Sequence, residues 1–329
     1  MIPGRVSVVI PTCNERFLQP TIDSLLGTAH GDVEIYAVLD GGPDQAIRED
    51  KRVIMVRHKE RVGMRETVNR LASSVSGEFL MKCDGHCLFG LGWDTALKGD
   101  CDGDWVAVPT RHSIDGKRWR ACGPSGRTVN YEIGGYNYHY MSFAYAKSLY
   151  GYGLHGVTFP LDINNALNIE ARDRPIDDLM SFQGSCWFTP TANFLRLGPL
   201  DQTNYNFYAE SIEVGMRQWI SGGRVVINKK TWQAHYHKGA NNLHTIDGRV
   251  GRGFYLSLNG KRAAEAYATD YWMNDRMPGA ARTFAWFVAH FWDLLQRIPN
   301  DHQWPADWAD PKYRVDFLNR PPEEIPAHL

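Results

Sequence analysis

Two side chains that can bind a metal ion lie one residue apart, directly after a short apolar run. Asp84 and His86 follow Phe79–Met81, which has the character of a buried strand. In an open parallel sheet, ligands bind just beyond the carboxyl ends of the strands, where both side chains are expected. A carboxylate beside an imidazole suits Mn²⁺ better than the all-oxygen site that Ca²⁺ prefers. The alternative is a strand end that carries a turn aspartate and an incidental histidine.

A histidine pair occurs much later in the chain. His235 and His237 are separated by one residue and follow a short β-branched run at 224–228. On a strand, alternate side chains point to the same side, so either ring could reach a common ligand. The alternative for each ring is a core histidine.

The elements around these residues predict an α/β sheet. Strands are expected at 5–10, 33–39, 53–56, 79–81 and 105–109, with helices at 18–26 and 64–75. This order places the functional loops on one edge of the sheet. No Gly-x-Gly-x-x-Gly turn follows the first strand and no Gly-x-x-x-x-Gly-Lys-Ser/Thr loop occurs, so a bound phosphate needs another source of positive charge, such as a metal ion.

Composition narrows the class of protein. The 329 residues are 43% hydrophobic with a net charge of −1, enough for one large domain and an appendage. No global basic field indicates nucleic acid or anionic membrane as a partner. The six cysteines lack a disulfide or zinc-knuckle spacing and are expected to be free thiols. The first residues carry no signal segment and 284–298 is interrupted by polar residues, so we expect a cytoplasmic protein without a transmembrane segment.

Three blocks of this chain resemble successive motifs of a known family. They are Val-Ser-Val-Val-Ile-Pro-Thr-Cys-Asn-Glu at 6–15, Leu-Asp-Gly-Gly-Pro-Asp at 39–44 and Ser-Gly-Glu-Phe-Leu-Met-Lys-Cys-Asp-Gly-His at 76–86. Together they are similar to family 2 glycosyltransferases of the GT-A fold. The Asp-x-His variant, with the Cys and Gly-Trp that follow, resembles more closely the polypeptide N-acetylgalactosaminyltransferases. The resemblance spans about residues 5–240 and implies a mixed sheet flanked by helices, a nucleotide-sugar donor, most simply a UDP-sugar, and Mn²⁺ or Mg²⁺ on its diphosphate.

The resemblance also assigns the donor site. It implies that Thr12 and Glu15 line the nucleoside pocket and that Asp40 accepts a hydrogen bond from the uracil imide or a ribose hydroxyl. It brings Arg61 or Arg65 to the base or the diphosphate. The alternatives are that Thr12 shapes a turn, that Asp40 is a turn residue before two glycines, and that the arginines lie on a solvated helix face.

In the related transferases a histidine near the end of the catalytic domain is the third metal ligand. His235 matches that position, so the resemblance implies a site made of Asp84, His86 and His235, with His237 as the alternative to His235. Lys238 would then assist the leaving diphosphate as a point charge.

The family's Gly-Gly-Glu-Asn-x-Glu segment, which contacts sugar and acceptor, is only partly preserved here. Tyr208 and Ala209 replace its glycines and Ser211 its asparagine, which leaves the sugar preference open. Glu210 and Glu213 match its two acidic positions and share a helix face.

Of these two glutamates, Glu210 is the better candidate for the catalytic group that contacts the acceptor hydroxyl or the transferring sugar. Glu213 is equally explained by a salt bridge to Arg217 one turn later. The sequence leaves inversion and retention of the anomeric configuration both open.

The chain divides at about residue 238. We expect a catalytic domain at 1–238 and, at 239–329, a lid or linker followed by a helical C-terminal extension. Helices are expected at 263–275 and 280–298, and the second has an apolar face that would dock on the main domain or form a homodimer.

The function that these features favour is a metal-dependent transfer of a hexosyl or N-acetylhexosaminyl group from a UDP-sugar to a hydroxyl. Candidate acceptors are a glycan, a protein, a metabolite or a modified nucleobase in DNA, and the neutral pI weakens the last. The alternatives are a nucleotidyltransferase and a non-catalytic module that binds sugar nucleotides. A nucleotidyltransferase would require a basic glycine-rich loop after the first strand. A non-catalytic module would tolerate loss of Asp84 or His86.

Overall fold

The chain folds around one large mixed sheet. The structure is a computed structural model, and it describes residues 1–122, 139–143, 154–158, 166–167, 169–171, 173–205, 208–236, 244–246, 249–251, 258–295 and 297. Its ten-stranded sheet has the order β10-β12-β6-β11-β4-β1-β2-β3, with β5 paired to β12 and β7 paired to β6. The strands are β1 (Ile2–Thr12), β2 (Val33–Asp40), β3 (Val53–His58), β4 (Gly77–Cys83), β5 (Cys87–Phe89), β6 (Trp105–Asp115), β7 (Arg120–Cys122), β10 (Ile176–Asp178), β11 (Cys186–Pro190) and β12 (Arg224–His235).

The sheet is parallel in its first half and mixed in its second. β1 pairs in parallel with β2 and β4, and β2 with β3. β11 is inserted antiparallel between β4 and β6, whereas β12 runs parallel to β6. The carboxyl ends of β1, β2, β4, β6 and β12 therefore reach the same edge of the sheet.

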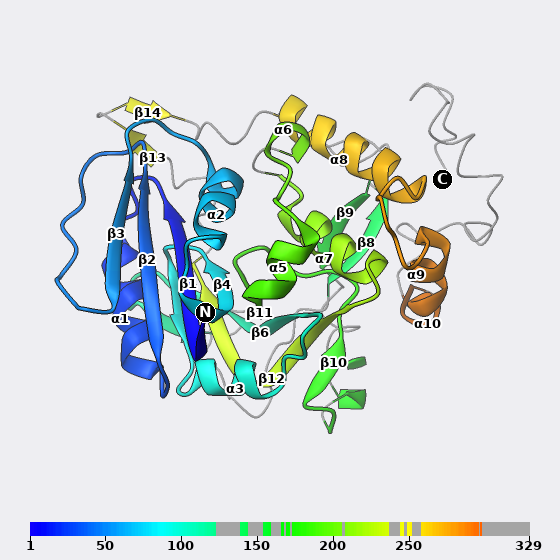
Figure 1. Cartoon of the computed structure of the whole chain (residues 1–329), viewed down its shortest axis with the longest axis horizontal. Coiled ribbons are helices and arrows are strands. Elements are labelled where there is room, and N and C mark those ends of the chain that lie inside the picture. Colours follow the sequence, from blue (N-terminus) through cyan, green and yellow to red (C-terminus); the bar gives the residue numbers. More distant parts are fainter. Residues whose placement is uncertain are drawn as a thin grey trace.

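Helices cover both faces of this sheet (Figure 1). On one face, α1 (Leu18–Thr28) and α3 (Trp93–Gly99) pack in a core cluster with strand residues such as Val8 and Ile35. On the other face, α2 (Met64–Ala72), α5 (Thr191–Leu197) and α7 (Glu210–Ile220) share a second cluster with residues such as Val9 and Leu80. Two apolar layers on a sheet buried on both sides explain why its first strands read as continuous apolar runs.

The C-terminal helices belong to the second core cluster. α8 (Leu258–Met273) and α9 (Phe284–His290) pack against α7, and the short α6 (Gln202–Tyr205) packs against α8. Phe284 and Phe287 are at most 1% exposed within this chain. The apolar face of the second expected helix thus docks on the main domain, the first of the two possibilities, and these side chains are not available to a twin subunit.

Some expected elements differ from the observed ones. The helix expected at 280–298 is interrupted, because Phe291 ends α9 and α10 (Trp292–Leu295) follows as a separate short helix. The stretch expected to form a lid or linker contains β13 (His244–Ile246) and β14 (Arg249–Gly251), which pair antiparallel. A further antiparallel pair, β8 (His139–Phe143) and β9 (Leu154–Thr158), was not expected.

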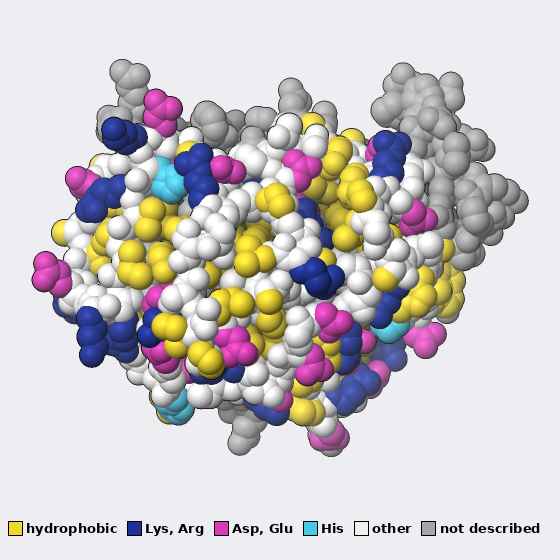
Figure 2. Space-filling view, viewed as in Figure 1, with side chains coloured by type: hydrophobic (Ala, Val, Ile, Leu, Met, Phe, Trp, Pro, Cys, Tyr) yellow, Lys and Arg dark blue, Asp and Glu magenta, His cyan; other side chains and the backbone are white. Residues whose placement is uncertain are grey.

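The cysteines and the surface charges are as the composition predicts. All six cysteines are free. On the face drawn in Figure 2, positive and negative side chains are interspersed and do not separate into fields of one sign. In the described ranges, no helix combines the length and the apolar character that crossing a bilayer demands.

Candidate active site

Asp84 extends from the carboxyl end of β4, where the chain leaves the centre of the sheet. Its backbone N–H donates to the Ser185 carbonyl at 2.9 Å, which ties it to the segment before β11. The next residue, Gly85, lies against the loop after β1, and a Cβ there would be 2.6 Å from Thr12 Cγ2. Only glycine therefore lets the chain turn closely between Asp84 and His86.

Strand pairing brings the two histidines together. β5 begins directly after His86 and runs antiparallel to the end of β12, with Cys87 opposite His235. The Tyr236 N–H donates to the His86 carbonyl at 3.0 Å and continues this pairing. The two imidazole ring centroids are consequently 4.7 Å apart.

Asp84, His86 and His235 form a compact cluster whose ligand atoms lie within 4.8 Å of one another. His235 Nε2 is 3.2 Å and His86 Nε2 3.9 Å from Asp84 Oδ2. Burial lowers the pKa of His235, although Asp84 opposes this effect, so the ring is neutral and keeps a lone pair for a metal. One carboxylate and two imidazoles make a donor set that fits Mn²⁺ or another borderline divalent ion.

Glu15 orients one of these ligands. Its Oε2 lies 2.9 Å from His86 Nδ1, and its Oε1 accepts from the Phe17 backbone N–H at 3.1 Å. A hydrogen bond from Nδ1–H to a carboxylate leaves Nε2 free to bind a metal, and this is the usual partner of a metal-binding histidine. Glu15 thus contacts a candidate ligand, whereas the expectation had placed it at the nucleoside.

A buried ammonium joins Asp84 to Glu210. Lys82 Nζ lies 2.8 Å from Asp84 Oδ1 and 3.0 Å from Glu210 Oε2. The other Glu210 oxygen accepts from the Trp187 indole N–H at 2.8 Å. Burial alone would raise the pKa of Asp84, but the Lys82 charge and the two histidines hold it well below its ordinary value. Glu210, at the first turn of α7, therefore lies in the same polar group as the metal ligands.

Arg111 is a second cation that the motifs did not indicate. It lies on β6 near the end of the sheet, and its guanidinium donates to Gln183 Oε1 at 2.7 Å. Burial lowers its pKa to about 10, so it remains charged at neutral pH. It pairs in register with Gln233 of β12, two positions before His235, and its charge contributes to lowering the pKa of His235. A signal was present in the sequence, because Arg111 lies two positions after the apolar run at 105–109.

Asp40 and Thr12, expected at the donor, both make hydrogen bonds within the protein. Asp40 is buried at the end of β2, and its two oxygens accept from the Val62 and Gly63 N–H groups at 2.7 and 2.8 Å. Thr12 donates its hydroxyl to the Val38 carbonyl at 2.7 Å. Asp40 thereby holds the loop that carries Arg61, and each of its oxygens keeps a further lone pair for a ligand.

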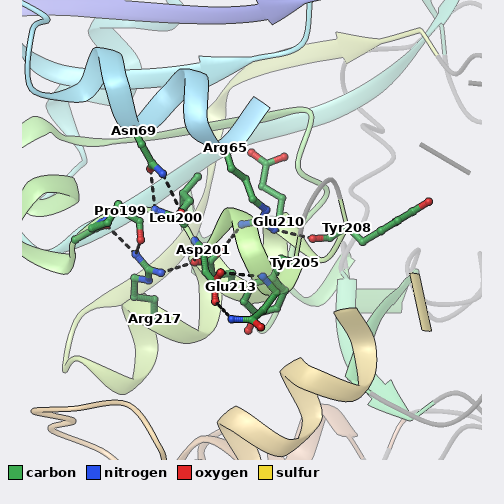
Figure 3. A network of polar contacts seen from close by, with 12 residues as sticks. Arg65, Asn69, Pro199, Leu200, Asp201, Tyr205, Tyr208, Glu210, Glu213 and Arg217 are labelled. Carbon is green, nitrogen blue, oxygen red and sulfur yellow. Dashed lines mark hydrogen bonds and ion pairs between the residues drawn. The ribbon is translucent and has the colours of Figure 1, made fainter. Parts of the chain in front are cut away.

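Arg65 and Glu213 have contacts other than those expected. Arg65 is fully buried, forms an ion pair with Glu213 and donates to the Tyr208 carbonyl at 2.6 Å. Arg217 forms an ion pair with the other oxygen of Glu213. Figure 3 shows these side chains converging between α2 and α7. The contacts favour a structural role for Arg65 and Glu213, and the Glu213–Arg217 salt bridge considered as an alternative is present.

Three expected residues remain, of which only Arg61 lies in the described part of the chain. Arg61 lies in the loop before α2, and its backbone is so close to Gly41 that a Cβ there would be 2.5 Å from the Arg61 nitrogen. His237 and Lys238 lie outside the described residues, so their assignments stay predictions.

Comparisons with known proteins identify chains of similar sequence. The family model described as "Glycosyl transferase family 2" matches residues 7–150. A Drosophila melanogaster protein described as polypeptide N-acetylgalactosaminyltransferase 13 is 25% identical over 350 residues, covering 96% of this chain and 58% of that protein. The chain thus spans little more than half the length of this relative.

Matches among solved structures have low sequence identity to this chain. A crystal structure of GalNAc-T7 with UDP, GalNAc and Mn²⁺ has a TM-score of 0.63 at 15% identity, covering 90% of this chain and 58% of that one. S. aureus TarS 1–349 in complex with UDP-GlcNAc has a TM-score of 0.48 at 12% identity, covering 98% and 78%.

The sheet and the cluster at its edge define this chain as a protein of the GT-A fold. The resemblance to family 2 glycosyltransferases, and among them to the polypeptide N-acetylgalactosaminyltransferases, is confirmed.

Proposed function

We propose that this protein is a metal-dependent glycosyltransferase that transfers a sugar from a nucleoside-diphosphate sugar, of the UDP class, to a hydroxyl acceptor. The observation that carries the proposal is the convergence of Asp84, His86 and His235 at the edge of a GT-A sheet. The compounds bound to GalNAc-T7 and the name of the Drosophila relative support a UDP-linked hexose or N-acetylhexosamine as donor.

Each part of the site has a role in this reaction. A divalent ion held by Asp84, His86 and His235 would neutralise the diphosphate and make it a better leaving group. Arg111 adds a fixed positive charge on the same edge. Glu210 offers a carboxylate at the start of α7 that would receive the acceptor proton if the reaction inverts the anomeric centre.

The first test is ligand stabilisation. We expect UDP-GalNAc, UDP-GlcNAc or UDP-glucose to raise the melting temperature only when Mn²⁺ is present, because the cation links the diphosphate to the protein. GDP-mannose and TDP-glucose should have smaller effects. Stabilisation by nucleoside triphosphates in place of UDP-sugars would support a nucleotidyltransferase and contradict the proposal.

The second test is donor hydrolysis in the absence of an acceptor. Asp84→Ala should abolish Mn²⁺-dependent release of UDP while leaving the circular dichroism spectrum unchanged. Asp44→Ala is the matched control, because Asp44 is 83% exposed and pairs only with Arg57 among the described contacts. Unchanged hydrolysis in Asp84→Ala would contradict the site, and binding without hydrolysis or transfer would support a non-catalytic module.

The acceptor is then identified by supplying the donor with candidate hydroxyls of each class. Glycans, peptides, small metabolites and DNA that contains a hydroxymethylated base test the acceptors considered. We also propose that the enzyme is soluble and cytoplasmic. Fractionation of the producing cell tests this location.

A further inference from the structure

Lys82 is an unusual residue for its position. It lies near the end of β4, in the middle of the main sheet, with its side chain 2% exposed. A lysine is almost never buried to this extent unless it is paired.

The contacts of this ammonium are fully specified. Nζ lies 2.8 Å from Asp84 Oδ1, 3.0 Å from Glu210 Oε2 and 2.7 Å from the Gly184 carbonyl oxygen. An ammonium has three N–H donors, and these three acceptors use all of them. Lys82 therefore has no donor left for a phosphate, which separates it from a lysine that binds substrate directly.

The surrounding groups are built to keep this arrangement. Gly184 approaches so closely that a Cβ there would lie 2.7 Å from Glu210 Oε2. The Trp187 indole holds the second oxygen of Glu210 at 2.8 Å, and the Trp187 ring stacks on Phe194 at 5.7 Å between centroids. Glu210 is thus held from two sides by groups from β4 and β11, although it belongs to α7.

The charges explain what Lys82 contributes. Asp84 and Glu210 are like charges bound to one nitrogen, and without it they would repel each other or compete for the same cation. Because Lys82 occupies Oδ1 of Asp84, only Oδ2 faces the two histidines. A metal ion held by the cluster would then meet one oxygen of Asp84, and Glu210 would stay bound to Lys82.

We infer that Lys82 is a positioning residue that couples the metal site to the acceptor side of the active site. It limits Asp84 to one coordinating oxygen and fixes Glu210 at the start of α7, where an acceptor would bind. The inference rests on the proposed function, because it takes the existence of an acceptor from it. The expected effect of Lys82 on metal binding does not depend on catalysis.

The test is the affinity for Mn²⁺ alone, measured from the electron paramagnetic resonance signal of the free ion. Lys82→Met removes the charge and keeps the chain length. We expect Mn²⁺ to bind about fivefold to tenfold more tightly, because a repelling charge is lost and both Asp84 oxygens become available. UDP-sugar hydrolysis should fall at least about tenfold, because Glu210 is released. A residue with a merely structural role would weaken Mn²⁺ binding or leave it unchanged.

Lys229→Met is the matched control. Lys229 is also a buried lysine, 4% exposed, and it lies 3.6 Å from Asp177 and 2.7 Å from the Ala171 carbonyl. This variant should bind Mn²⁺ with the wild-type affinity. Tighter binding in both lysine variants would show a non-specific effect of charge and overturn the inference.

Trp187→Phe keeps the inference testable if Lys82→Met does not fold. It removes only the indole N–H from Glu210 and keeps an aromatic ring in the core. We expect unchanged Mn²⁺ affinity and slower hydrolysis, with the loss in kcat and not in KM. Wild-type kcat in this variant would overturn the positioning of Glu210.

The two proposals fail in different ways. If the wild-type protein binds Mn²⁺ and Lys82→Met binds it more tightly, but no UDP-sugar is turned over, the glycosyltransferase proposal is wrong and the effect of Lys82 on the ligands is supported. If wild-type protein hydrolyses the donor and Lys82→Met matches it in Mn²⁺ affinity and rate, the inference about Lys82 is wrong.

Discussion

At the scale of single residues, two of the three candidate metal ligands are held in place by side chains outside their cluster. Glu15 holds the ring of His86 through Nδ1, and Lys82 holds Asp84 through Oδ1. In both cases a second atom of the ligand is fixed, so that the first atom faces the shared site. Partners of this kind set the tautomer and direction of a ligand and strongly affect affinity.

Loss of the Glu15 carboxylate should therefore weaken the metal site without removing a ligand. Glu15→Ala is expected to lower Mn²⁺ affinity by about tenfold to a hundredfold, because His86 loses the acceptor that fixes its tautomer. Glu15→Gln, which keeps an acceptor oxygen, should lose less. Titration of Mn²⁺ against each variant measures the effect, and equal affinity in Glu15→Ala and wild type would contradict it.

At the scale of secondary-structure elements, α2 and α7 are joined by a buried ion-pair network. Arg65 of α2 and Arg217 of α7 both bind Glu213, whose Oε1 also accepts from the Asp201 N–H at 2.7 Å. Asn69 of α2 adds a pair of hydrogen bonds to Leu200, at 2.9 and 2.7 Å (Figure 3). This network fixes the helix that carries Glu210 against the helix that follows the Arg61 loop.

Glu213→Gln should be mainly a stability variant. The variant leaves Arg65 and Arg217 buried without the negative charge of Glu213. Breaking a buried ion pair in this way typically lowers the free energy of unfolding by about 3–5 kcal/mol. Urea unfolding measures this loss of the free energy of unfolding. Glu66→Gln is the control on α2, because its pair with Arg70 is largely exposed and should contribute under about 1 kcal/mol.

The same experiment separates structure from catalysis at Glu213. If Glu213 acts as a base, Glu213→Gln would keep wild-type stability and lose donor turnover. We expect the opposite pattern, with lower stability and Mn²⁺ affinity close to wild type in the protein that remains folded.

At the scale of the whole molecule, the C-terminal helices complete the core beside the main sheet. Phe287 of α9 is fully buried, and its ring lies 6.5 Å from Trp219 of α7. The division expected at residue 238 therefore does not separate two cores, because both sides of it contribute to one apolar cluster.

Phe287→Ala should destabilise the whole protein by about 3–5 kcal/mol, the usual cost of replacing a buried phenylalanine with alanine. The change in urea midpoint measures it. Leu91→Ala is the control, because Leu91 is 73% exposed and its truncation should be nearly neutral. A small effect of Phe287→Ala would mean that the C-terminal helices form a separate folding unit.

Stability should also fall in mild acid through a buried histidine. Burial, followed by the charge of Arg111, lowers the pKa of His112 to about 4. Between about pH 6.5 and 4 the unfolded chain binds a proton that the folded ring does not, so stability is lost as the pH falls. The loss from this one group should reach about 2 kcal/mol at pH 5.

His112→Phe removes that group and keeps a ring beside Trp232, 5.8 Å away in the wild type. As the pH falls from 7 to 5, the free energy of unfolding of the wild type should decrease relative to that of the variant. Taking the difference cancels the carboxylates that both proteins share. A difference that stays constant with pH would contradict the assignment.

The sequence by itself determined the order of the first strands and helices and indicated the first two candidate ligands. Apolar runs fixed β1, β2, β3 and β4, and chain direction placed their carboxyl ends on one edge. Asp84 and His86 are local to one strand end, so their proximity needed no knowledge of the fold. The motifs, read as a resemblance, implied His235 as the third candidate ligand.

Only the tertiary structure decided which distant groups meet and which are buried. His235 lies 151 positions from Asp84 and reaches it through the pairing of β5 with β12, which no local pattern encodes. Lys82 and Glu210 are 128 positions apart, and Arg65 and Glu213 are 148 apart. A charged residue at one position looks the same in sequence whether it faces solvent, substrate or a buried partner, because burial depends on what the rest of the chain packs against it.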